Sequence, residues 1–432
     1  MLAAFTVSMG YGVVLPLLPY LVERLLGASS DIGRISTSTG LLTGLYTFSL
    51  FVFAPVWGHL SDRHGRRVIL LIGLVGFGMT MLTFALFESL VAVYAERFLS
   101  GVFAAAVTPV ALAVIGDLAP TDAARARHLT FVSFAGISGF LLGPMLGIFI
   151  AQGSARMLAV IGAPSSLALP LAATSALAFI VALGVMMTGP GSSRWPASPY
   201  TKSVAKGTAI WVVPKLLSLA FIVSAGIGVF EVGLALRGKQ ELELAPYQIA
   251  LMFTECSLVM IVVQALVFSP WVKPEVTRWF IGPALGVLAA GLFLVPRASD
   301  FASMLLVIGA VASSAGVLSP ILTYWISTRA GRAQGAQLGR QTAAASLGAA
   351  IGSVAGGYMF NISLFPGVSF VFAAVLALLG VALSIGLPKT LVARTADTDG
   401  VDVGAELLMA GMSDDRDPRS ETSPISPVRS LP

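Results

Sequence analysis

The chain has 432 residues, of which 56% are hydrophobic and only 11% are charged, with three histidines, one cysteine and a formal net charge of +5. An average soluble domain has roughly 25% charged residues, so this composition indicates a protein that lies in a lipid bilayer. The single Cys256 excludes an intramolecular disulfide framework. We attribute the basic excess to membrane topology and expect no nucleic-acid partner.

Twelve apolar stretches are each long enough to cross a hydrocarbon core of about 30 Å as a helix, and none has the alternating pattern of a barrel strand. The sequence therefore predicts an all-α membrane protein with twelve transmembrane helices. The predicted spans are residues 3–22, 38–57, 68–87, 91–116, 130–151, 167–187, 210–234, 247–269, 279–295, 303–326, 338–360 and 366–387.

Lysine and arginine are unevenly distributed among the connections between these spans. The loops 2/3, 4/5, 6/7, 8/9 and 10/11 contain thirteen of them, and the opposite loops contain six. The positive-inside rule therefore predicts that both termini are cytoplasmic. The first apolar run is as long as a span and follows no basic segment, so we expect no cleavable signal peptide. The host membrane is expected to be the bacterial inner membrane or one derived from it.

The connection between spans two and three reads GHLSDRHGRR, residues 58–67. Gly65 can adopt a positive φ at a tight turn. Asp62 is the only acid among these cations, so it can cap a neighbouring helix or pair with an arginine. Asp117, at the end of span four, is a candidate partner for Arg66 or Arg67. The alternative is that the arginines, Arg63 included, only fix the topology, but topology requires no aspartate.

A polar linker at residues 188–209 divides the chain into an N-terminal six-helix half, residues 1–187, and a C-terminal six-helix half, residues 210–387. Residues 388–432 contain many acidic, serine and proline residues, and they predict a disordered cytoplasmic tail. This tail is either inert or docks a protein partner.

Spans five and eleven both contain small residues four positions apart, which lets helix backbones approach closely. Every matched glycine has the same offset of 209 residues (352 minus 143). This register favours a duplication that produced two pseudo-symmetric bundles. The residues are Gly139, Gly143, Pro144 and Gly147 in span five, and Gly348, Gly352 and Gly356 in span eleven.

Ionisable residues inside spans are costly and are candidates for function. Glu255 lies near the middle of span eight, where a carboxyl group that gains and loses a proton would serve proton-coupled transport. The alternative is a buried acid that binds a neighbouring helix. Glu231 is expected to reach water near the outer end of span seven. Arg97 adjoins Glu96, which is expected to face elsewhere on the helix.

Met252, Glu255, Cys256 and Met260 share one predicted helical face and could hold a transition metal. The alternative is ordinary packing, because methionine is common in spans and the histidines all lie in loops. Three aromatic residues, Tyr46, Tyr324 and Trp325, could line a cavity for an organic cargo, or could serve packing or interfacial anchoring.

The GHLSDRHGRR segment resembles the loop 2/3 signature of the major facilitator superfamily, G-x-L-x-D-R-x-G-R-R/K. The resemblance implies that Gly58, Asp62, Arg63, Gly65, Arg66 and Arg67 form a conformational latch, which contacts the start of span eleven and stabilises the outward-open state. It also implies two six-helix halves that give alternating access to a central site. The equivalent loop of the second half lacks the aspartate.

Two further elements resemble those of the superfamily's drug/proton antiporters. The span-five glycine–proline element matches, except that Ile148 replaces a glycine. The segment from Arg97 to Gly101 matches R-x-x-Q-G with Ser100 in place of glutamine, and the resemblance implies a role for Arg97 in proton transfer. Span one lacks the acid found in tetracycline-type antiporters.

These features predict a secondary active transporter that exports a small amphipathic organic compound by proton coupling. A carrier of metal ions (iron-type) or metabolites stays open as an alternative, as does a membrane scaffold or sensor that uses the acidic tail. The sequence contains no phosphate loop and no convergent catalytic triad, so we expect neither an enzyme nor a cofactor.

Overall fold

The computed structural model describes residues 1–27, 31–84, 89–118, 122–161, 168–188, 211–267, 269, 272–329, 334–362 and 367–392. Residues 189–210 and 393–432, which hold nearly all of the expected linker and tail, lie outside the described residues. The chain divides into two units, Met1–Ile385 and Gly386–Pro432. The helix α14 (Leu387–Val392) belongs to the second unit.

The first half of the larger unit contains spans one to six. Span one consists of α1 (Leu2–Val14), the 3-10 turn η1 (Leu15–Leu17) and α2 (Leu18–Leu26). The following spans are α3 (Ile32–His64), α4 (Arg66–Phe84), α5 (Leu90–Leu118), α6 (Asp122–Ile161) and α7 (Ala168–Thr188).

The second half contains spans seven to twelve. In span nine, the helix is flanked by two 3-10 turns. The elements are α8 (Val212–Gln240), α9 (Pro246–Val267), η2 (Pro274–Phe280), α10 (Ile281–Leu294), η3 (Val295–Arg297), α11 (Phe301–Arg329), α12 (Gln334–Met359) and α13 (Val368–Ser384).

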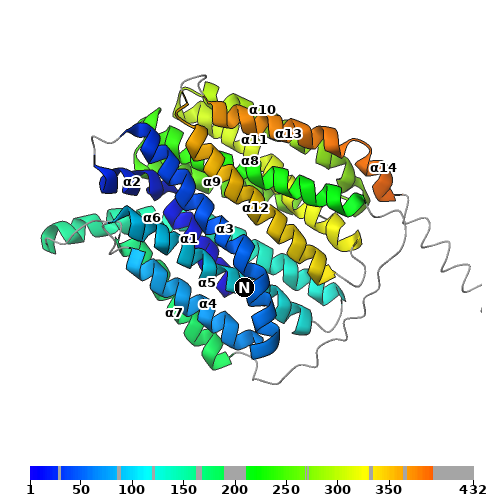
Figure 1. Ribbon diagram of the computed structural model, residues 1–432, viewed down its shortest axis with the longest axis horizontal. Helices are drawn as coiled ribbons and strands as arrows, with labels where there is room; N and C mark the ends of the chain where they lie inside the picture. Colours follow the sequence, from blue (N-terminus) through cyan, green and yellow to red (C-terminus); the bar gives the residue numbers. More distant parts are fainter. Residues whose placement is uncertain are drawn as a thin grey trace, which may run out of the picture. The chain divides into compact units, whose positions relative to one another are not determined.

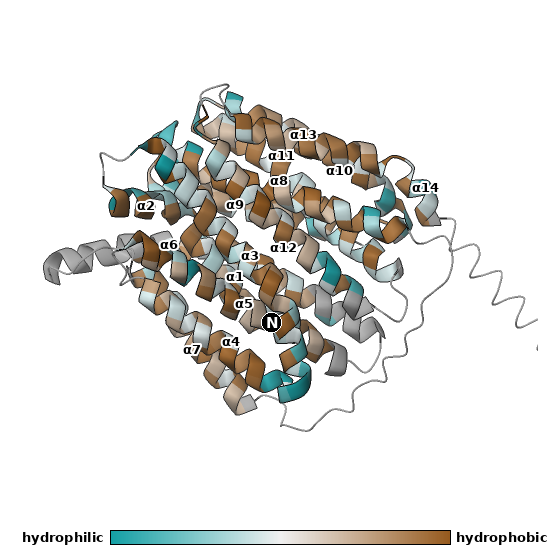
Figure 2. Cartoon of the chain, in the orientation of Figure 1, coloured by the Kyte–Doolittle hydropathy of each residue, from teal (hydrophilic) through white to brown (hydrophobic). Residues whose placement is uncertain are grey.

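Within the described residues, nine helical segments are long and apolar enough to cross a membrane. Shorter apolar helices occur at Phe131–Gly147 within α6 and at Val368–Ser384. With α12, which is rich in small residues, these segments account for the twelve predicted spans and confirm the all-α membrane fold. Figure 2 shows that apolar residues dominate the helices.

Span one is not one continuous helix, because prolines interrupt it. Pro16 lies in the first turn of η1 and Pro19 in the first turn of α2. Proline has no backbone N–H to donate, so it is tolerated in the first turn of a helix, whereas in a helix interior it kinks or breaks the helix. As a result α2 is a separate nine-residue helix, which ends at Gly27 with a φ of 91°.

The segment between spans two and three is mostly helical, contrary to the expected loop of about ten residues. α3 continues to His64, α4 begins at Arg66, and the turn is made at Gly65 with a φ of 94°. An L side chain rarely adopts that conformation, so glycine is required at this position.

The two halves repeat the same helix pairings. α1 packs on α6 as α8 packs on α12, α3 on α5 as α9 on α11, and α4 on α7 as α10 on α13. Figure 1 shows the helices of the first half, from blue to teal, beside those of the second half, from green to orange.

The glycine elements lie at equivalent helix crossings in the two halves. A Cβ atom at Gly139, Gly143 or Gly147 would meet residues of α1, and one at Gly348, Gly352 or Gly356 would meet residues of α8. The contacted residues also share one offset, 216 residues (221 minus 5), so the crossings have the same register. They are Phe5, Met9 and Val13 in α1, and Phe221, Ala225 and Val229 in α8.

Candidate functional site

Four aromatic rings form a continuous row through the middle of the bundle, which we call the aromatic ladder. Tyr46 of α3 stacks on Tyr11 of α1 with ring centroids 5.0 Å apart. Tyr11 stacks in turn on Phe140 of α6 at 5.8 Å, and Phe140 meets the edge of Phe253 of α9 at 6.4 Å. The ladder therefore begins in the first half and ends in the second.

Glu231 of α8 joins the ladder from the second half. The Tyr11 hydroxyl donates a hydrogen bond of 2.8 Å to Glu231 Oε2. The expectation that Glu231 lies near the outer end of its span is wrong, because α8 continues to Gln240, although the Glu231 side chain remains partly exposed. Nine further residues extend the helix by about 13 Å beyond Glu231, and the carboxyl group meets the partner half instead.

Glu255 of α9 has a different environment, since a Cβ atom at Gly309 of α11 would lie 3.8 Å from its Oε1 atom. Cys256 is within electrostatic range of both carboxyl groups. The Oε2 atom of Glu255 is buried and has no hydrogen-bond partner among the described residues. A buried acceptor without a partner costs free energy, so its persistence calls for a functional explanation.

Arg97 and Glu96 of α5 form a buried ion pair, with each side chain about 2% exposed. Arg97 Nε and Nη2 donate to the two Glu96 carboxylate oxygens at 2.8 and 3.2 Å. The expectation that Glu96 faces elsewhere is therefore wrong. Although adjacent residues point about 100° apart on a helix, these two side chains are long enough to meet.

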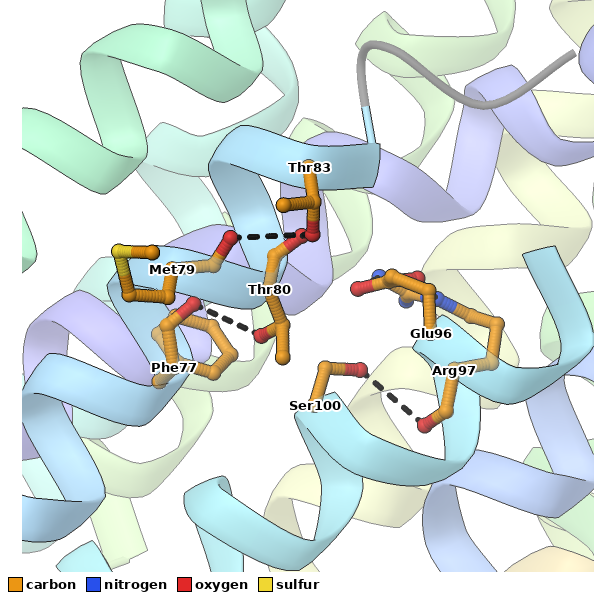
Figure 3. Close-up of polar contacts among 7 residues, drawn as sticks. All are labelled: Phe77, Met79, Thr80, Thr83, Glu96, Arg97 and Ser100. Carbon is orange, nitrogen blue, oxygen red and sulfur yellow. Dashed lines mark hydrogen bonds and ion pairs between the residues drawn. The ribbon is translucent and has the colours of Figure 1, made fainter. Parts of the chain in front are cut away.

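The surroundings of this pair are aromatic and weakly polar. The Arg97 guanidinium carbon lies 4.7 Å from the ring centroid of Phe84 and 5.6 Å from that of Tyr46, so it contacts the end of the ladder by cation–π interactions. Figure 3 shows Glu96 and Arg97 beside Thr80, with Ser100 one turn further along α5. The Ser100 hydroxyl donates to the Arg97 carbonyl oxygen at 3.1 Å.

The proposed metal site gains no support from the structure. Among the described residues, no group of three or more His, Cys, Asp and Glu side chains could hold a metal ion. Met252 is fully buried, whereas Glu255, Cys256 and Met260 are partly exposed.

The segment at residues 58–67 lies at one end of the bundle, which we call the Asp62 end. Asp62 pairs with Arg66 one turn away at 2.5 Å, and its side chain is 58% exposed. Arg66 also donates to the Ser61 hydroxyl at 2.6 Å. The side chain of the other candidate partner, Asp117, lies outside the described residues.

Other residues of this segment differ in their surroundings. Arg67 donates to the Met186 carbonyl oxygen of α7, within the first half. Arg63 is exposed, and a Cβ atom at Gly58 would meet nothing within 4 Å.

The opposite end, which we call the Lys239 end, joins the halves by polar contacts to α2. Lys239 of α8 pairs with Glu23 at 2.5 Å and donates to the Pro19 carbonyl oxygen at 3.0 Å. The Tyr20 hydroxyl donates to the Leu244 carbonyl oxygen at 2.5 Å. We call these five residues the Lys239 cluster.

Helices α3 and α12 also meet closely at this end. A Cβ atom at Gly40 would lie 2.7 Å from the Cα atom of Gly357. The Asn361 side chain donates to the Ile32 carbonyl oxygen and to the Ser36 hydroxyl, at 3.1 and 3.0 Å. The halves are therefore in backbone contact toward the Lys239 end.

Sequence reasoning missed Tyr11 and the pairing of Glu96 with Arg97. A tyrosine within an apolar span was the available signal for Tyr11, but its partner is 220 residues away. Of the three aromatic candidates, only Tyr46 lies in the ladder. Tyr324 and Trp325 pack on each other at 5.4 Å, and the Trp325 indole N–H donates to Thr277.

Comparison with known proteins agrees with this architecture. A sequence profile described as Major Facilitator Superfamily matches residues 1–333. Multidrug resistance protein 2 of Bacillus subtilis (strain 168) is 28% identical over 384 residues, covering 88% of this chain and 92% of that protein. Quinolone resistance protein NorA of Staphylococcus aureus (strain COL) is 27% identical over 365 residues, covering 83% and 88%.

Solved structures share the fold. The inward open conformation of the xylose transporter XylE from E. coli has a TM-score of 0.67 at 18% identity, covering 89% of this chain and 94% of that chain. The human organic anion transporter MFSD10 has a TM-score of 0.63 at 19% identity, covering 89% and 97%. The solved structures confirm the expected fold, and the family match confirms the interpretation as a transporter. The chain therefore belongs to the Major Facilitator Superfamily of membrane transporters.

Proposed function

We propose that this transporter exports small amphipathic organic compounds in exchange for protons, and that Glu231 and Glu255 bind the protons and the cargo. One observation carries the proposal: the Glu231 carboxyl group of the second half accepts a hydrogen bond from an aromatic ladder that reaches into the first half, and Glu255, with its unpartnered Oε2, lies on the helix that contributes Phe253 to that ladder. The names of the relatives, which refer to multidrug and quinolone resistance, support an organic cargo that is moved outward.

The chemistry of the site suits a flat cargo that carries a positive charge. Aromatic faces offer apolar contact area and attract cations. A carboxylate provides the counter-charge, but only while it is deprotonated. Because a proton and a cationic cargo compete for the same carboxylates, binding of one displaces the other, which is the requirement for exchange.

Arg97 has a different part in this proposal. Its charge is already neutralised by Glu96 within the same helix. We propose that the pair acts as a fixed electrostatic element behind Tyr46 and influences proton transfer from there, without binding the cargo.

Reconstituted protein in vesicles tests the coupling directly. A fluorescent aromatic cation is supplied on one side and a pH gradient is imposed. We expect Glu231→Gln and Glu255→Gln each to abolish gradient-driven flux, because neither amide exchanges a proton at working pH. The matched control is Glu243→Gln, which changes an exposed carboxylate outside the site. Wild-type flux in both site variants would overturn the proposal.

We further propose that the Asp62 end faces the cytoplasm of a bacterial inner membrane. The excess of lysine and arginine on the loops of that side supports this orientation, and it makes both termini cytoplasmic. The Lys239 cluster then closes the outer side, so the described conformation is inward-facing. Labelling of single cysteines at the two ends, in oriented vesicles, measures the orientation.

For the Asp62 segment we propose a role in the conformational equilibrium and not in cargo choice. Its contact with the start of span eleven would form when the inner side closes, whereas Asp62 is exposed in the inward-facing state. We expect Asp62→Asn to lower the transport rate with unchanged ratios of rates between cargos. An altered cargo preference, or an unchanged rate, would contradict this role.

The acidic tail is the basis for a proposed protein partner. Deletion of residues 393–432 distinguishes an inert tail from a tail that docks a protein partner. If the tail is inert, the shortened transporter keeps its flux and the proteins that co-purify with it. Loss of a co-purifying protein, with flux unchanged, would support a docking role.

A further inference from the structure

We propose that the Tyr11 hydroxyl donates a hydrogen bond to the Glu231 carboxylate while neither a proton nor a cargo is bound there. This hydrogen bond prevents the deprotonated, cargo-free transporter from changing conformation. The inference rests on the proposed proton-coupled exchange and deepens it. Tyr11 is a positioning residue here, because it acts through Glu231.

The hydrogen bond between Tyr11 and Glu231 joins the two halves. Its donor is in α1 and its acceptor is in α8. Alternating access moves one half against the other around the central site. A hydrogen bond between the halves near mid-bundle must therefore stretch or break during each conformational change.

The Tyr11 hydroxyl is held in a fixed position by the first half. Its ring is stacked between Tyr46 and Phe140, both of the first half. The adjacent Gly12 lies against α6, where a Cβ atom would be 2.8 Å from the Phe140 carbonyl oxygen. Tyr11 cannot follow Glu231 when the second half moves, because neighbouring helices fix its ring and its backbone.

The strength of the bond depends on whether Glu231 is protonated. A hydroxyl that donates to a carboxylate forms a charge-assisted hydrogen bond, which is roughly twice as strong as one to a neutral group. Protonation of Glu231 removes this charge, and a bound cation competes for the same oxygen. Either event weakens the link between the halves, and each corresponds to a loaded transporter.

Other charged and titratable groups surround this bond. From α9, Cys256 lies on the Glu231 side with Glu255 next to it in the chain, and Tyr46 of α3 and Arg97 of α5 lie behind Tyr11. Helix α12, which packs most extensively on α8, contributes Gly348, Gly352 and Ser353 at the contact. Tyr11 is the hydrogen-bond donor from the partner half that the structure gives Glu231.

The consequence is a barrier against futile cycling. Without the bond, the empty deprotonated transporter could open outward, bind a proton and return, so that protons would leak inward without export. Tyr11→Phe keeps the stacked ring and removes only the hydroxyl, so it isolates this function from packing.

The test is a cargo-free proton leak. Vesicles that contain reconstituted protein and an internal pH-sensitive dye are placed in an external pH step without cargo. We expect Tyr11→Phe to raise the protein-dependent leak about tenfold, the factor that one charge-assisted hydrogen bond provides. Tyr94→Phe is the matched control, since Tyr94 packs on the core of the first half outside the site.

A double variant excludes a merely structural effect. If Glu231 carries the leaking proton, Tyr11→Phe/Glu231→Gln returns the leak to the wild-type level. A wild-type leak in Tyr11→Phe, or a leak that persists in the double variant, overturns the inference. If Glu231→Gln still abolishes coupled flux in that case, the proposed function stands. If neither Glu231→Gln nor Glu255→Gln impairs coupled flux, both the proposed function and this inference are overturned.

Discussion

In the first half, Glu96 and Arg97 neutralise each other through two hydrogen bonds within one helix. In the second half, Glu231 accepts its hydrogen bond from a neutral tyrosine of the other half, and Glu255 Oε2 has no partner among the described residues. The two halves have the same helix pairings, so this difference comes from the side chains and not from the fold.

The contrast indicates that the buried charged groups of the two halves have different roles. A buried charge with a resident counter-ion has little reason to exchange a proton, because the partner stabilises the charged form. A carboxyl group without a resident cation can alternate between a proton, a cargo and a hydrogen-bond donor. In the proposed mechanism, the Glu96–Arg97 pair of the first half is thus a fixed element, and Glu231 and Glu255 of the second half are the exchangeable groups.

The largest effect is expected from Arg97→Met. It leaves the buried Glu96 without its partner, so the free energy of unfolding should fall by about 3–5 kcal/mol. Thermal unfolding in detergent measures the loss. The double variant Glu96→Gln/Arg97→Met should recover most of it, because no buried charge remains. An equal loss in both variants would mean that the pair is not an energetic unit.

Cys256→Arg would make the second half resemble the first. A cation close to Glu231 and Glu255 stabilises their deprotonated forms, by roughly 4 kcal/mol for a unit charge 4 Å away at an effective dielectric constant of 20. Proton-coupled flux should therefore fall at least tenfold. Cys256→Ser, which adds no charge, should transport at the wild-type rate, and equal flux in both variants would remove the contrast between the halves.

Glu255→Gln should have a much smaller effect on stability than Arg97→Met. No hydrogen-bond partner of Oε2 is lost, so we expect the free energy of unfolding to change by about 1 kcal/mol or less. Unfolding in detergent should therefore show nearly wild-type stability for Glu255→Gln, whereas flux in vesicles should be lost. A loss as large as that of Arg97→Met would reveal a resident partner for Glu255.

The smallest effect is expected from Lys239→Met. Lys239 pairs with Glu23, a basic side chain with a glutamate as in the buried Arg97–Glu96 pair, but these two side chains are 10% and 43% exposed. Exposed pairs contribute about 0–1 kcal/mol and are screened by salt. Distances between spin labels at the Lys239 end should show a modest shift toward the outward-open state. High salt should cause a shift of the same size in the wild type, because it screens the ion pair. If high salt causes no shift, the cause is not electrostatic.

Most of the fold could be predicted from local sequence. Long apolar runs can only be helices in a bilayer, and the glycine register at positions 143 and 352 correctly indicated two equivalent halves. Gly65 was expected at a turn because glycine tolerates a positive φ. Helix ends were less predictable, since polar residues such as Ser61 and His64 continue α3 where an apolar pattern stops.

The site was predicted only in part. Glu255 and Arg97 stand out because charge is rare in spans. The position of Glu231 within its span was misjudged, because the length of α8 beyond it could not be read from hydropathy. The pairing of Glu96 with Arg97 depends on side-chain conformations, which helical periodicity does not describe.

The sequence by itself determined that this chain is a twelve-helix transporter, since bilayer solvation dictates helices and the segment 58–67 carries the resemblance to the superfamily. Only the tertiary structure decided which of its buried charges are neutralised and which are not. Tyr11 and Glu231 are 220 residues apart, and no local pattern encodes their contact. It exists because η1 and α2, which follow the helix of Tyr11 directly in the chain, pack against α8 where the two halves meet.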